Sequence, residues 1–351
     1  MAADKIDWNN ISFQYRDTNG YMKYTWTLEN GWDQGSFETD PYLKVHMCAT
    51  GLNYGQQCFE GLKAFKDKQG RVRIFRPQEN AARMRRSAPI AHMPEVPEEI
   101  FLDGCKRTCE KNIDFVPPVE SDGAFYLRPL LFGSGPMIGM NAAPEFTFVV
   151  FGMPVGSYYK GGITPAKAVI MEAIDRAAPK GTGSAKLGGN YAPTFGPMGK
   201  KMAEGYTLTL HLDAKTRSYV DEFSTSNFVA LTPPDANGVR TFVTPNSESI
   251  LRSVTRLTLE DICTKFGWKV EERPVAWSEI VEGKFNEVAA CGTAVVLTPV
   301  KSITRGDQVI AIGDQEKIGE GFQKLYDYYR GVQKSDIEDS FGWMWPAEGL
   351  A

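Results

Sequence analysis

The most informative stretch of the chain is Ser184-Ala185-Lys186-Leu187-Gly188-Gly189-Asn190-Tyr191-Ala192-Pro193. Its lysine is surrounded by small residues, which let a flat, bulky group lie against the backbone. A second stretch, Asp221-Glu222-Phe223-Ser224-Thr225-Ser226-Asn227, puts a carboxylate into a polar strand-and-turn pattern. A lysine amine, a tyrosine hydroxyl and a carboxylate are together suited to an aldehyde cofactor that carries a pyridine ring.

The composition indicates a globular protein of two domains. The chain has 351 residues, of which 42% are hydrophobic and 23% charged, and domains usually hold about 100–200 residues. A net charge of −4 argues against a nucleic-acid partner, because phosphate binding needs a basic excess. No apolar run approaches the roughly 18 residues of a membrane span. The first residues are neither apolar nor rich in arginine, so we expect a cytoplasmic location, although a mitochondrial one stays open.

The cysteines and histidines do not suggest a metal centre. None of the six cysteines forms a Cys-x-x-Cys pair, and none of the three histidines has another at helical spacing. Cys105 and Cys109 are one helical turn apart on an apolar face, which predicts buried thiols. We therefore expect neither structural disulfides nor a bound metal.

The pattern of apolar residues predicts an α+β fold. In the first half, alternating residues predict strands over 21–28, 71–75, 123–130 and 146–151, and helical spacing predicts helices over 79–90 and 98–112. In the second half we expect strands over 166–173, 206–212 and 228–232, a buried strand over 287–296 that a glycine turn interrupts, and helices over 191–204, 250–266 and 319–330. The predicted domains are 1–151 and 166–351, joined by a glycine- and proline-rich linker over 152–165.

Two other interpretations of Lys186 are a solvent-facing lysine in a glycine-rich loop and a phosphate-binding loop. The phosphate-binding motif needs Gly-Lys followed by Ser or Thr. Here the lysine stands between Ala185 and Leu187, so this motif is rejected. A solvent-facing lysine without a catalytic role remains the alternative.

The segments around Lys186 and Glu222, together with Asn53-Tyr54-Gly55-Gln56-Gln57-Cys58-Phe59-Glu60-Gly61-Leu62-Lys63-Ala64-Phe65, resemble the branched-chain amino acid aminotransferases, a fold-type IV pyridoxal phosphate family. The resemblance extends from about Phe13 to Trp343. It implies a smaller amino-terminal α/β domain, a larger carboxyl-terminal domain with a barrel-like sheet, and pyridoxal 5′-phosphate between them. It also implies a ping-pong transfer of the amino group of leucine, isoleucine or valine to 2-oxoglutarate.

The resemblance assigns roles in cofactor binding. Lys186 corresponds to the lysine that bonds covalently to the cofactor and moves the substrate proton. Tyr191 corresponds to the donor to the phenolic oxygen, and Glu222 to the partner of the pyridine nitrogen. Further cofactor-binding positions, most of them on the phosphate side, are Arg83, Thr225, Asn227, Val254, Thr255 and Thr293. One departure is that Arg252-Ser253 stands where the family has Pro-Gly, which puts the phosphate-binding turn in question.

The resemblance also outlines a substrate pocket. Its matching positions are Phe13, Tyr54, Phe59, Tyr126, Arg128, Met140, Thr293 and Ala294. Tyr126 and Arg128 correspond to the pair that receives the second carboxylate of glutamate. Met140 lies on a loop that in the family reaches the neighbouring subunit, so a homodimer is expected. Taken singly, each aromatic residue is also explained by packing in a core.

Three alternatives to this function remain from the sequence. A fold-type IV transaminase for D-amino acids or (R)-amines would share the lysine, the glutamate and the phosphate groups, but 54–65 and 126–129 favour the branched-chain type. The 4-amino-4-deoxychorismate lyases use the same cofactor and are commonly shorter. A binding protein without catalysis would keep the fold. The order of preference among leucine, isoleucine and valine is open, because one methylene contributes only about 1–3 kcal/mol.

Overall fold

A computed structural model describes residues 6–156, 162–314 and 316–350. The chain forms two compact units. The first consists of Met1–Tyr158, Ala185–Gly188 and Gly331–Ala351, and the second of Tyr159–Ser184 and Gly189–Arg330. The short segment with the candidate lysine therefore belongs to the first unit, although its neighbours on both sides belong to the second.

The first unit is built on a sheet that has nine strands among the described residues, in the order β18-β6-β5-β7-β8-β1-β2, with β3 beside β1 and β4 beside β7. All pairings in this sheet are antiparallel. The strands are β1 (Tyr21–Thr27), β2 (Gly31–Trp32), β3 (Ser36–Glu38), β4 (Gln57–Phe59), β5 (Leu62–Lys66), β6 (Val72–Phe75), β7 (Ala124–Gly133), β8 (Glu145–Val155) and β18 (Met344–Leu350).

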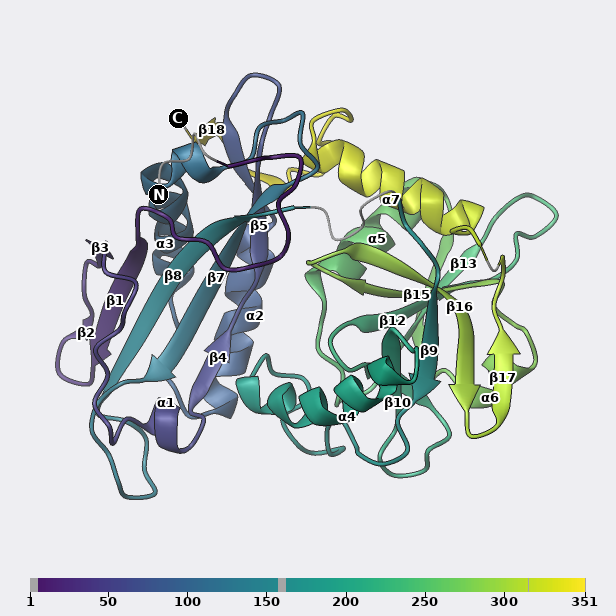
Figure 1. Ribbon diagram of the computed structural model, residues 1–351, viewed down its shortest axis with the longest axis horizontal. Helices are drawn as coiled ribbons and strands as arrows, with labels where there is room; N and C mark the ends of the chain where they lie inside the picture. Colours follow the sequence, from purple (N-terminus) through teal and green to yellow (C-terminus); the bar gives the residue numbers. More distant parts are fainter. Residues whose placement is uncertain (1–5, 157–161, 315, 351) are drawn as a thin grey trace. The chain divides into compact units, whose positions relative to one another are not determined.

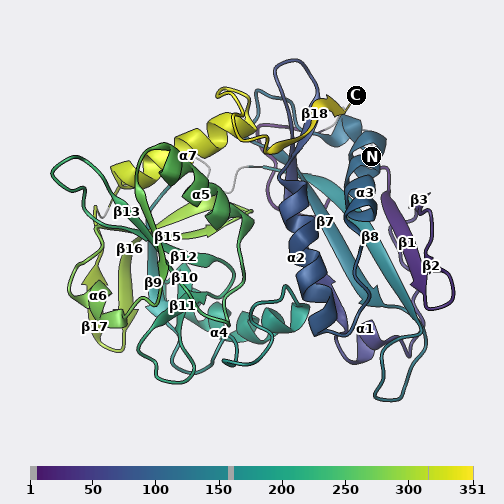
Figure 2. The same ribbon diagram turned by 180° about the vertical axis from the view of Figure 1, so that it is seen from behind.

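Two long helices, α2 (Pro77–Ile90) and α3 (Glu98–Lys111), cover one face of this sheet, as the views in Figure 1 and Figure 2 show from opposite sides. The shorter elements are α1 (Thr50–Asn53) and η2 (Ile113–Phe115). In α3 the side chains of Phe101, Cys105 and Cys109 recur at helical spacing and are completely buried. Burial raises the pKa of both thiols, which confirms the prediction of buried cysteines there. All six cysteines are free thiols.

The second unit is a closed barrel. Six strands follow one another as β11-β10-β9-β16-β15-β12, and a further pairing of β11 with β12 closes the ring. The strands of this sheet are β9 (Ala166–Ile170), β10 (Leu208–Leu212), β11 (Val220–Phe223), β12 (Asn227–Leu231), β13 (Thr241–Pro245), β14 (Lys269–Arg273), β15 (Glu287–Gly292), β16 (Val296–Arg305) and β17 (Gln308–Ala311). The barrel interior is apolar, with Phe223, Phe228 and Val288 among its buried side chains.

The helices that follow in the chain are η3 (Gly188–Asn190), α4 (Ala192–Ala203), α5 (Val254–Lys265), α6 (Trp277–Val281) and α7 (Glu320–Gln333). The structure thus confirms the α+β class and the barrel-like second sheet. The predicted strands and helices are all present, with shifted ends. Among the described residues, no helix is long and apolar enough to cross a membrane.

The predicted start of one helix is wrong. The helix expected from residue 250 begins at Val254, because Ser253 has an extended backbone and acts as its N-cap. The linker expected over 152–165 overlaps the end of β8, which continues to Val155 beside β7. Pro154 is tolerated there because β1 pairs with β8 only as far as Val150, so this end of β8 has a free edge. Residues 157–161 of the predicted linker lie outside the described residues.

The carboxyl-terminal strand adds to the first unit. β18 pairs with β6, so the last part of the chain is grouped with the amino-terminal sheet and not with the barrel. The sequence-based domain boundaries stay a prediction, but the strand pairing accounts for this difference at the carboxyl end.

Candidate active site

The backbone on both sides of Lys186 is tied to the first unit. Its amide donates to Ser87 Oγ at 2.9 Å, from a side chain on α2. Its carbonyl accepts from the amide of Phe59 at 3.1 Å, at the end of β4. The next residue, Leu187, forms an isolated bridge with Cys58. These contacts fix where the lysine side chain starts, and its Nζ lies 4.7 Å from the centre of the Phe59 ring.

A cation and aromatic rings cluster around the same phenylalanine. The guanidinium of Arg128 lies over Phe59 at 4.9 Å and over Tyr126 at 5.5 Å. It also donates to the Tyr126 hydroxyl at 3.2 Å. The ring of Phe13 meets Tyr126 edge-on at 5.0 Å. Residues from three distant parts of the sequence thus form one wall in which apolar faces surround a fixed positive charge.

Gly61 makes room for this wall. A Cβ at this position would lie 2.1 Å from the hydroxyl oxygen of Tyr126 and 3.0 Å from its ring carbon. No side chain fits at such distances, so the glycine of the Phe59-Glu60-Gly61 motif lets Tyr126 approach the backbone of the neighbouring strand. Packing against Tyr126 therefore requires the glycine of this motif, independently of the resemblance to the family.

Two of the predicted pocket residues lie elsewhere on the first unit. Tyr54 donates its hydroxyl to the carbonyl of Ile138 at 2.7 Å and is 47% exposed. Met140, on the same loop as Ile138, is 87% exposed. The structure does not bring these two side chains into the Phe59–Arg128 wall, and their role in a pocket stays a prediction.

Arg83, the predicted phosphate ligand, takes part in a buried ion pair. Its Nε and Nη2 lie 2.7 and 2.6 Å from the two carboxylate oxygens of Glu60. The amide of Asn80 also donates to Glu60, at 2.8 Å. Two parallel charge-assisted bonds hold the guanidinium plane in one orientation. The motif that contains Glu60 does not indicate that this residue orients Arg83 on α2.

In the second unit, Glu222 is a buried and strongly bound carboxylate. It lies on β11 and is 2% exposed. Its Oε1 accepts from the amide of Leu251 at 2.9 Å and pairs with Arg176 at 2.7 Å. Its Oε2 accepts from the side-chain amide of Asn227 at 3.2 Å. Asn227 faces Glu222 across the β11–β12 pairing, so the structure brings these two predicted residues together. Arg176 is not predictable from the sequence as a partner of Glu222, because it follows β9 in an irregular segment without a recognisable motif.

The amino terminus of α5 carries Val254 and Thr255, which are both buried. The first amides of a helix have no acceptor within the helix and point outward, which suits an anion such as phosphate. The family's glycine is not needed for this turn, because Ser253 has φ −91° and ψ 130°, which any L-residue adopts. Its hydroxyl accepts from the amide of Arg256 and caps the helix.

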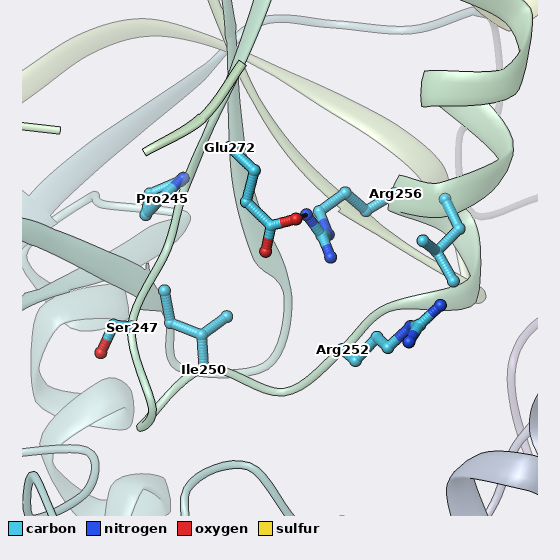
Figure 3. Close-up of a pocket in the computed structure, with 7 residues that line it drawn as sticks. Pro245, Ser247, Ile250, Arg252, Arg256 and Glu272 are labelled. Atoms are coloured by element: carbon cyan, nitrogen blue, oxygen red, sulfur yellow. Dashed lines mark ion pairs between the residues drawn. The ribbon is translucent and has the colours of Figure 1, made fainter. Parts of the chain in front are cut away.

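Arg256 anchors this helix to the barrel. It pairs with Glu260 at 2.9 Å and with Glu272 on β14 at 3.2 Å. Figure 3 shows the guanidinium pointing toward Glu272 at the edge of a cavity of about 240 Å³. The cavity is also lined by Arg252, the second residue that departs from the family pattern. These ion pairs compensate for the burial of the Arg256 charge, so this arginine has a structural role.

The remaining predicted residues lie on turns of the second unit. Tyr191 is the N-cap of α4, and Asn190 before it exchanges two hydrogen bonds of 2.7 Å with Thr182. Thr225 is exposed in the turn between β11 and β12. Thr293 and Ala294 follow β15, whose Cys291 lies opposite Asn227. This register brings the Thr293 turn close in the sheet to the turn that carries Thr225.

The groups in each unit fit pyridoxal phosphate chemically. The first unit presents a lysine amine beside an aromatic wall. The second presents a buried anionic group suited to a protonated pyridine nitrogen and a helix amino terminus suited to phosphate. Among the described residues, no group of three or more His, Cys, Asp or Glu side chains could hold a metal ion.

Comparison with known proteins identifies the family. Residues 57–303 match the model of amino-transferase class IV. Aminotransferase atnJ of Emericella nidulans is 43% identical over 93% of this chain and 94% of its own. The branched-chain-amino-acid aminotransferase of Haemophilus influenzae is 40% identical over 97% and 98%. The crystal structure of Escherichia coli branched-chain amino acid aminotransferase has the same fold, with a TM-score of 0.76 at 23% identity over 93% of this chain and 98% of that one. The chain therefore belongs to the class IV aminotransferases, which use pyridoxal phosphate.

Proposed function

We propose that this enzyme transfers the amino group of the branched-chain L-amino acids leucine, isoleucine and valine to 2-oxoglutarate. The observation that carries the proposal is the wall formed by Phe59, Tyr126 and Arg128 beside Lys186. The similarity to the Haemophilus influenzae enzyme supports it. The similar fungal transaminases make a specialised pathway an equally good setting for this activity.

The wall suits two different side chains in turn. An aliphatic side chain would lie against the faces of Phe59 and Tyr126, where burial contributes about 1.5–3 kcal/mol. The side-chain carboxylate of glutamate or 2-oxoglutarate would pair with the Arg128 guanidinium and accept from the Tyr126 hydroxyl. Both donor and acceptor could then use the same surface, as a ping-pong transaminase requires.

We assign the other predicted residues to the binding of the cofactor. When bound, the cofactor supplies the aldehyde that takes up the amino group and the ring that delocalises negative charge. Lys186 would hold it covalently and carry the proton of the substrate α-carbon. Glu222 would keep a proton at the pyridine nitrogen, and Tyr191 would donate to the phenolic oxygen. The phosphate would bind at Arg83 and at the amides of Val254, Thr255 and the Thr293 turn.

A panel of amino donors tests the proposal. L-leucine, L-isoleucine, L-valine, their D-enantiomers and an (R)-amine would each be incubated with the enzyme and 2-oxoglutarate, and glutamate formation measured. We expect turnover of the three L-amino acids only. Turnover confined to the D-amino acids or to the (R)-amine would replace the proposal by the related fold-type IV activity, and binding without turnover would leave a cofactor-binding protein.

We also propose a homodimer that forms through the Met140 loop. In support, the first unit has large apolar side chains that are exposed by 67–87%, namely Tyr42, Met47, Leu52, Ile138 and Met140. Exposed apolar surface of this kind is typical of a protein interface. Sedimentation equilibrium should give twice the mass of the chain, and Ile138→Asp should shift it to the monomer. A monomeric wild-type enzyme would refute the proposal. A cytoplasmic location stays a prediction.

A further inference from the structure

Arg176 forms a buried ion pair with Glu222. Its Nη1 lies 2.7 Å from Glu222 Oε1, and the two side chains are only 4% and 3% exposed. The same guanidinium nitrogen donates to the carbonyl of Ser249 at 3.3 Å. The arginine thus joins the segment after β9, the strand β11 and the loop before α5, all within the second unit.

A buried carboxylate needs such a partner to stay ionised. Removal from water disfavours the charged form of a carboxyl group, whereas an opposite charge within about 4–6 Å favours it. Leu251 and Asn227 add two neutral hydrogen bonds to Glu222, and the cation Arg176 is in direct contact with its carboxylate. Its charge also acts beyond this pair, since after burial it is the next largest cause that lowers the pKa of His211.

We propose that Arg176 is a positioning residue for the cofactor, because it holds Glu222 ionised and oriented toward the pyridine nitrogen. The inference rests on the proposed role of Glu222. A fixed cation behind the carboxylate stabilises negative charge on the oxygens, so the shared proton remains on the pyridine nitrogen. The protonated ring is the form that accepts electrons from the substrate.

A purely structural ion pair would behave differently. Loss of its cation would lower the stability of the apoenzyme, but the surviving folded protein would bind the cofactor with unchanged affinity. The positioning role instead predicts a change in two properties that need no turnover. These are the dissociation constant of pyridoxal phosphate and the pH at which the visible absorption of the bound cofactor changes.

The experiment compares Arg176→Gln, Arg176→Lys, Glu222→Gln and the double variant Arg176→Gln/Glu222→Gln as purified apoenzymes. Each is titrated with pyridoxal phosphate, and the spectrum of each complex is recorded across pH. Arg217→Gln is the matched control, because Arg217 pairs with Asp175 at 3.1 Å in the same unit but is 26% exposed and has no recorded contact with Glu222.

We expect Arg176→Gln to raise the dissociation constant roughly tenfold or more, the size typical of outer-shell partners of bound metals, and to shift the pH dependence of the spectrum. Arg176→Lys should keep the charge, lose the fork geometry and change both properties less. The double variant should bind no more weakly than Glu222→Gln alone, because Arg176 then has no carboxylate to orient. Arg217→Gln should match the wild type.

The outcomes separate the inference from the proposed function. Unchanged affinity and pH dependence in Arg176→Gln, or additive losses in the double variant, would overturn the inference alone. Unchanged properties in Glu222→Gln would overturn both, since Glu222 would then not face the pyridine nitrogen. If Arg176→Gln does not fold, the decision falls to Arg176→Lys, for which wild-type affinity together with a wild-type pH dependence would refute the role.

Discussion

The guanidinium of Arg128 lies over two aromatic rings. Its positive charge matters for glutamate and 2-oxoglutarate, but not for the branched-chain amino acids. Its guanidinium is 4.9 Å from the Phe59 ring and 5.5 Å from the Tyr126 ring. Leucine has no side-chain carboxylate, so it gains little from this cation. Glutamate and 2-oxoglutarate do have one, and a charge-assisted pair is costly to lose.

We therefore predict that Arg128→Leu separates the two half-reactions. Leucine should still convert the bound cofactor at a near-normal rate. Recovery by 2-oxoglutarate should slow by about a hundredfold, which corresponds to about 2.7 kcal/mol. Single-turnover absorbance changes measure each half-reaction, and Arg128→Lys, which keeps the charge, should fall between the two. Equal losses in both half-reactions would show that Arg128 only supports the wall.

Lys186 offers a second prediction at the level of one side chain. Lys186→Ala should abolish covalent attachment of pyridoxal phosphate while the protein stays folded, because the bonds of its backbone to Ser87 and Phe59 do not involve the amine. Borohydride treatment followed by mass spectrometry detects the adduct. The exposed Lys200→Ala variant should retain it. An adduct that persists in Lys186→Ala would assign the attachment to another lysine.

At the level of elements, the Glu60–Arg83 pair joins the β4–β5 connection to α2. Both side chains are buried, with exposures of 0% and 6%. Glu60→Gln would leave the arginine charge buried without its anion, and breaking a buried pair on one side costs about 3–5 kcal/mol. Glu95→Gln is the matched control, because Glu95 pairs with Arg85 at 3.2 Å while both side chains are about half exposed.

Urea unfolding of the apoenzymes measures this difference. The free energy of unfolding should fall by about 3 kcal/mol or more in Glu60→Gln and by less than about 1 kcal/mol in Glu95→Gln. Similar small losses in both variants would mean that α2 does not depend on the buried pair. In the folded fraction of Glu60→Gln, weaker binding of inorganic phosphate would in addition support the proposed role of Arg83.

The elements were predictable from the sequence where periodicity was sufficient. α3 is predictable because Cys105 and Cys109 are one helical turn apart on an apolar face, and β6 because apolar residues alternate over 71–75. The start of α5 was missed because apolar residues continue ahead of Ser253, and only the N-cap geometry distinguishes them.

Some residues of the candidate site were predictable from the sequence and others were not. Lys186, Glu222 and Arg128 stand in motifs that resemble a family, so the sequence pointed to them, although their roles are still proposals. Glu60 and Arg176 were not found as ion-pair partners, because each pairs with a residue far away in the sequence. Local patterns do not contain such pairs. They follow only from the folded structure, in which α2 lies beside the β4–β5 connection and the segment after β9 lies beside β11.

At the level of the whole molecule, one buried histidine links stability to pH. His211 is completely buried in the barrel unit, where its Nε2 lies 2.7 Å from Ser224 Oγ. Burial, with a smaller contribution from the charge of Arg176, lowers the pKa of His211 from 6.5 to about 4. Between these two values the unfolded chain binds a proton that the folded chain does not. Stability from this group is therefore present above pH 6.5 and is lost as the pH falls toward 4.

We expect the free energy of unfolding to fall by about 2 kcal/mol from this group between pH 7 and pH 5. His211→Gln should remove that part of the pH dependence, because glutamine does not titrate. The exposed His92→Gln should retain it. Urea unfolding of the wild type and the two variants at pH 7 and pH 5 measures this change in the free energy of unfolding. An identical pH dependence in wild type and His211→Gln would show that the ring is not desolvated in solution.

The pairing of β18 with β6 affects how the protein folds during translation. β6 lies between β5 and β18 in the first sheet, and β18 follows the barrel in the sequence, so a ribosome must translate the whole barrel before the first sheet can be completed. At about 5–20 residues per second, this interval lasts roughly 15–60 s. During that time the edge of β6 that β18 will cover presents unpaired amides and carbonyls, which are a template for aggregation. A truncation that removes β18 would leave this edge of β6 exposed for the lifetime of the protein.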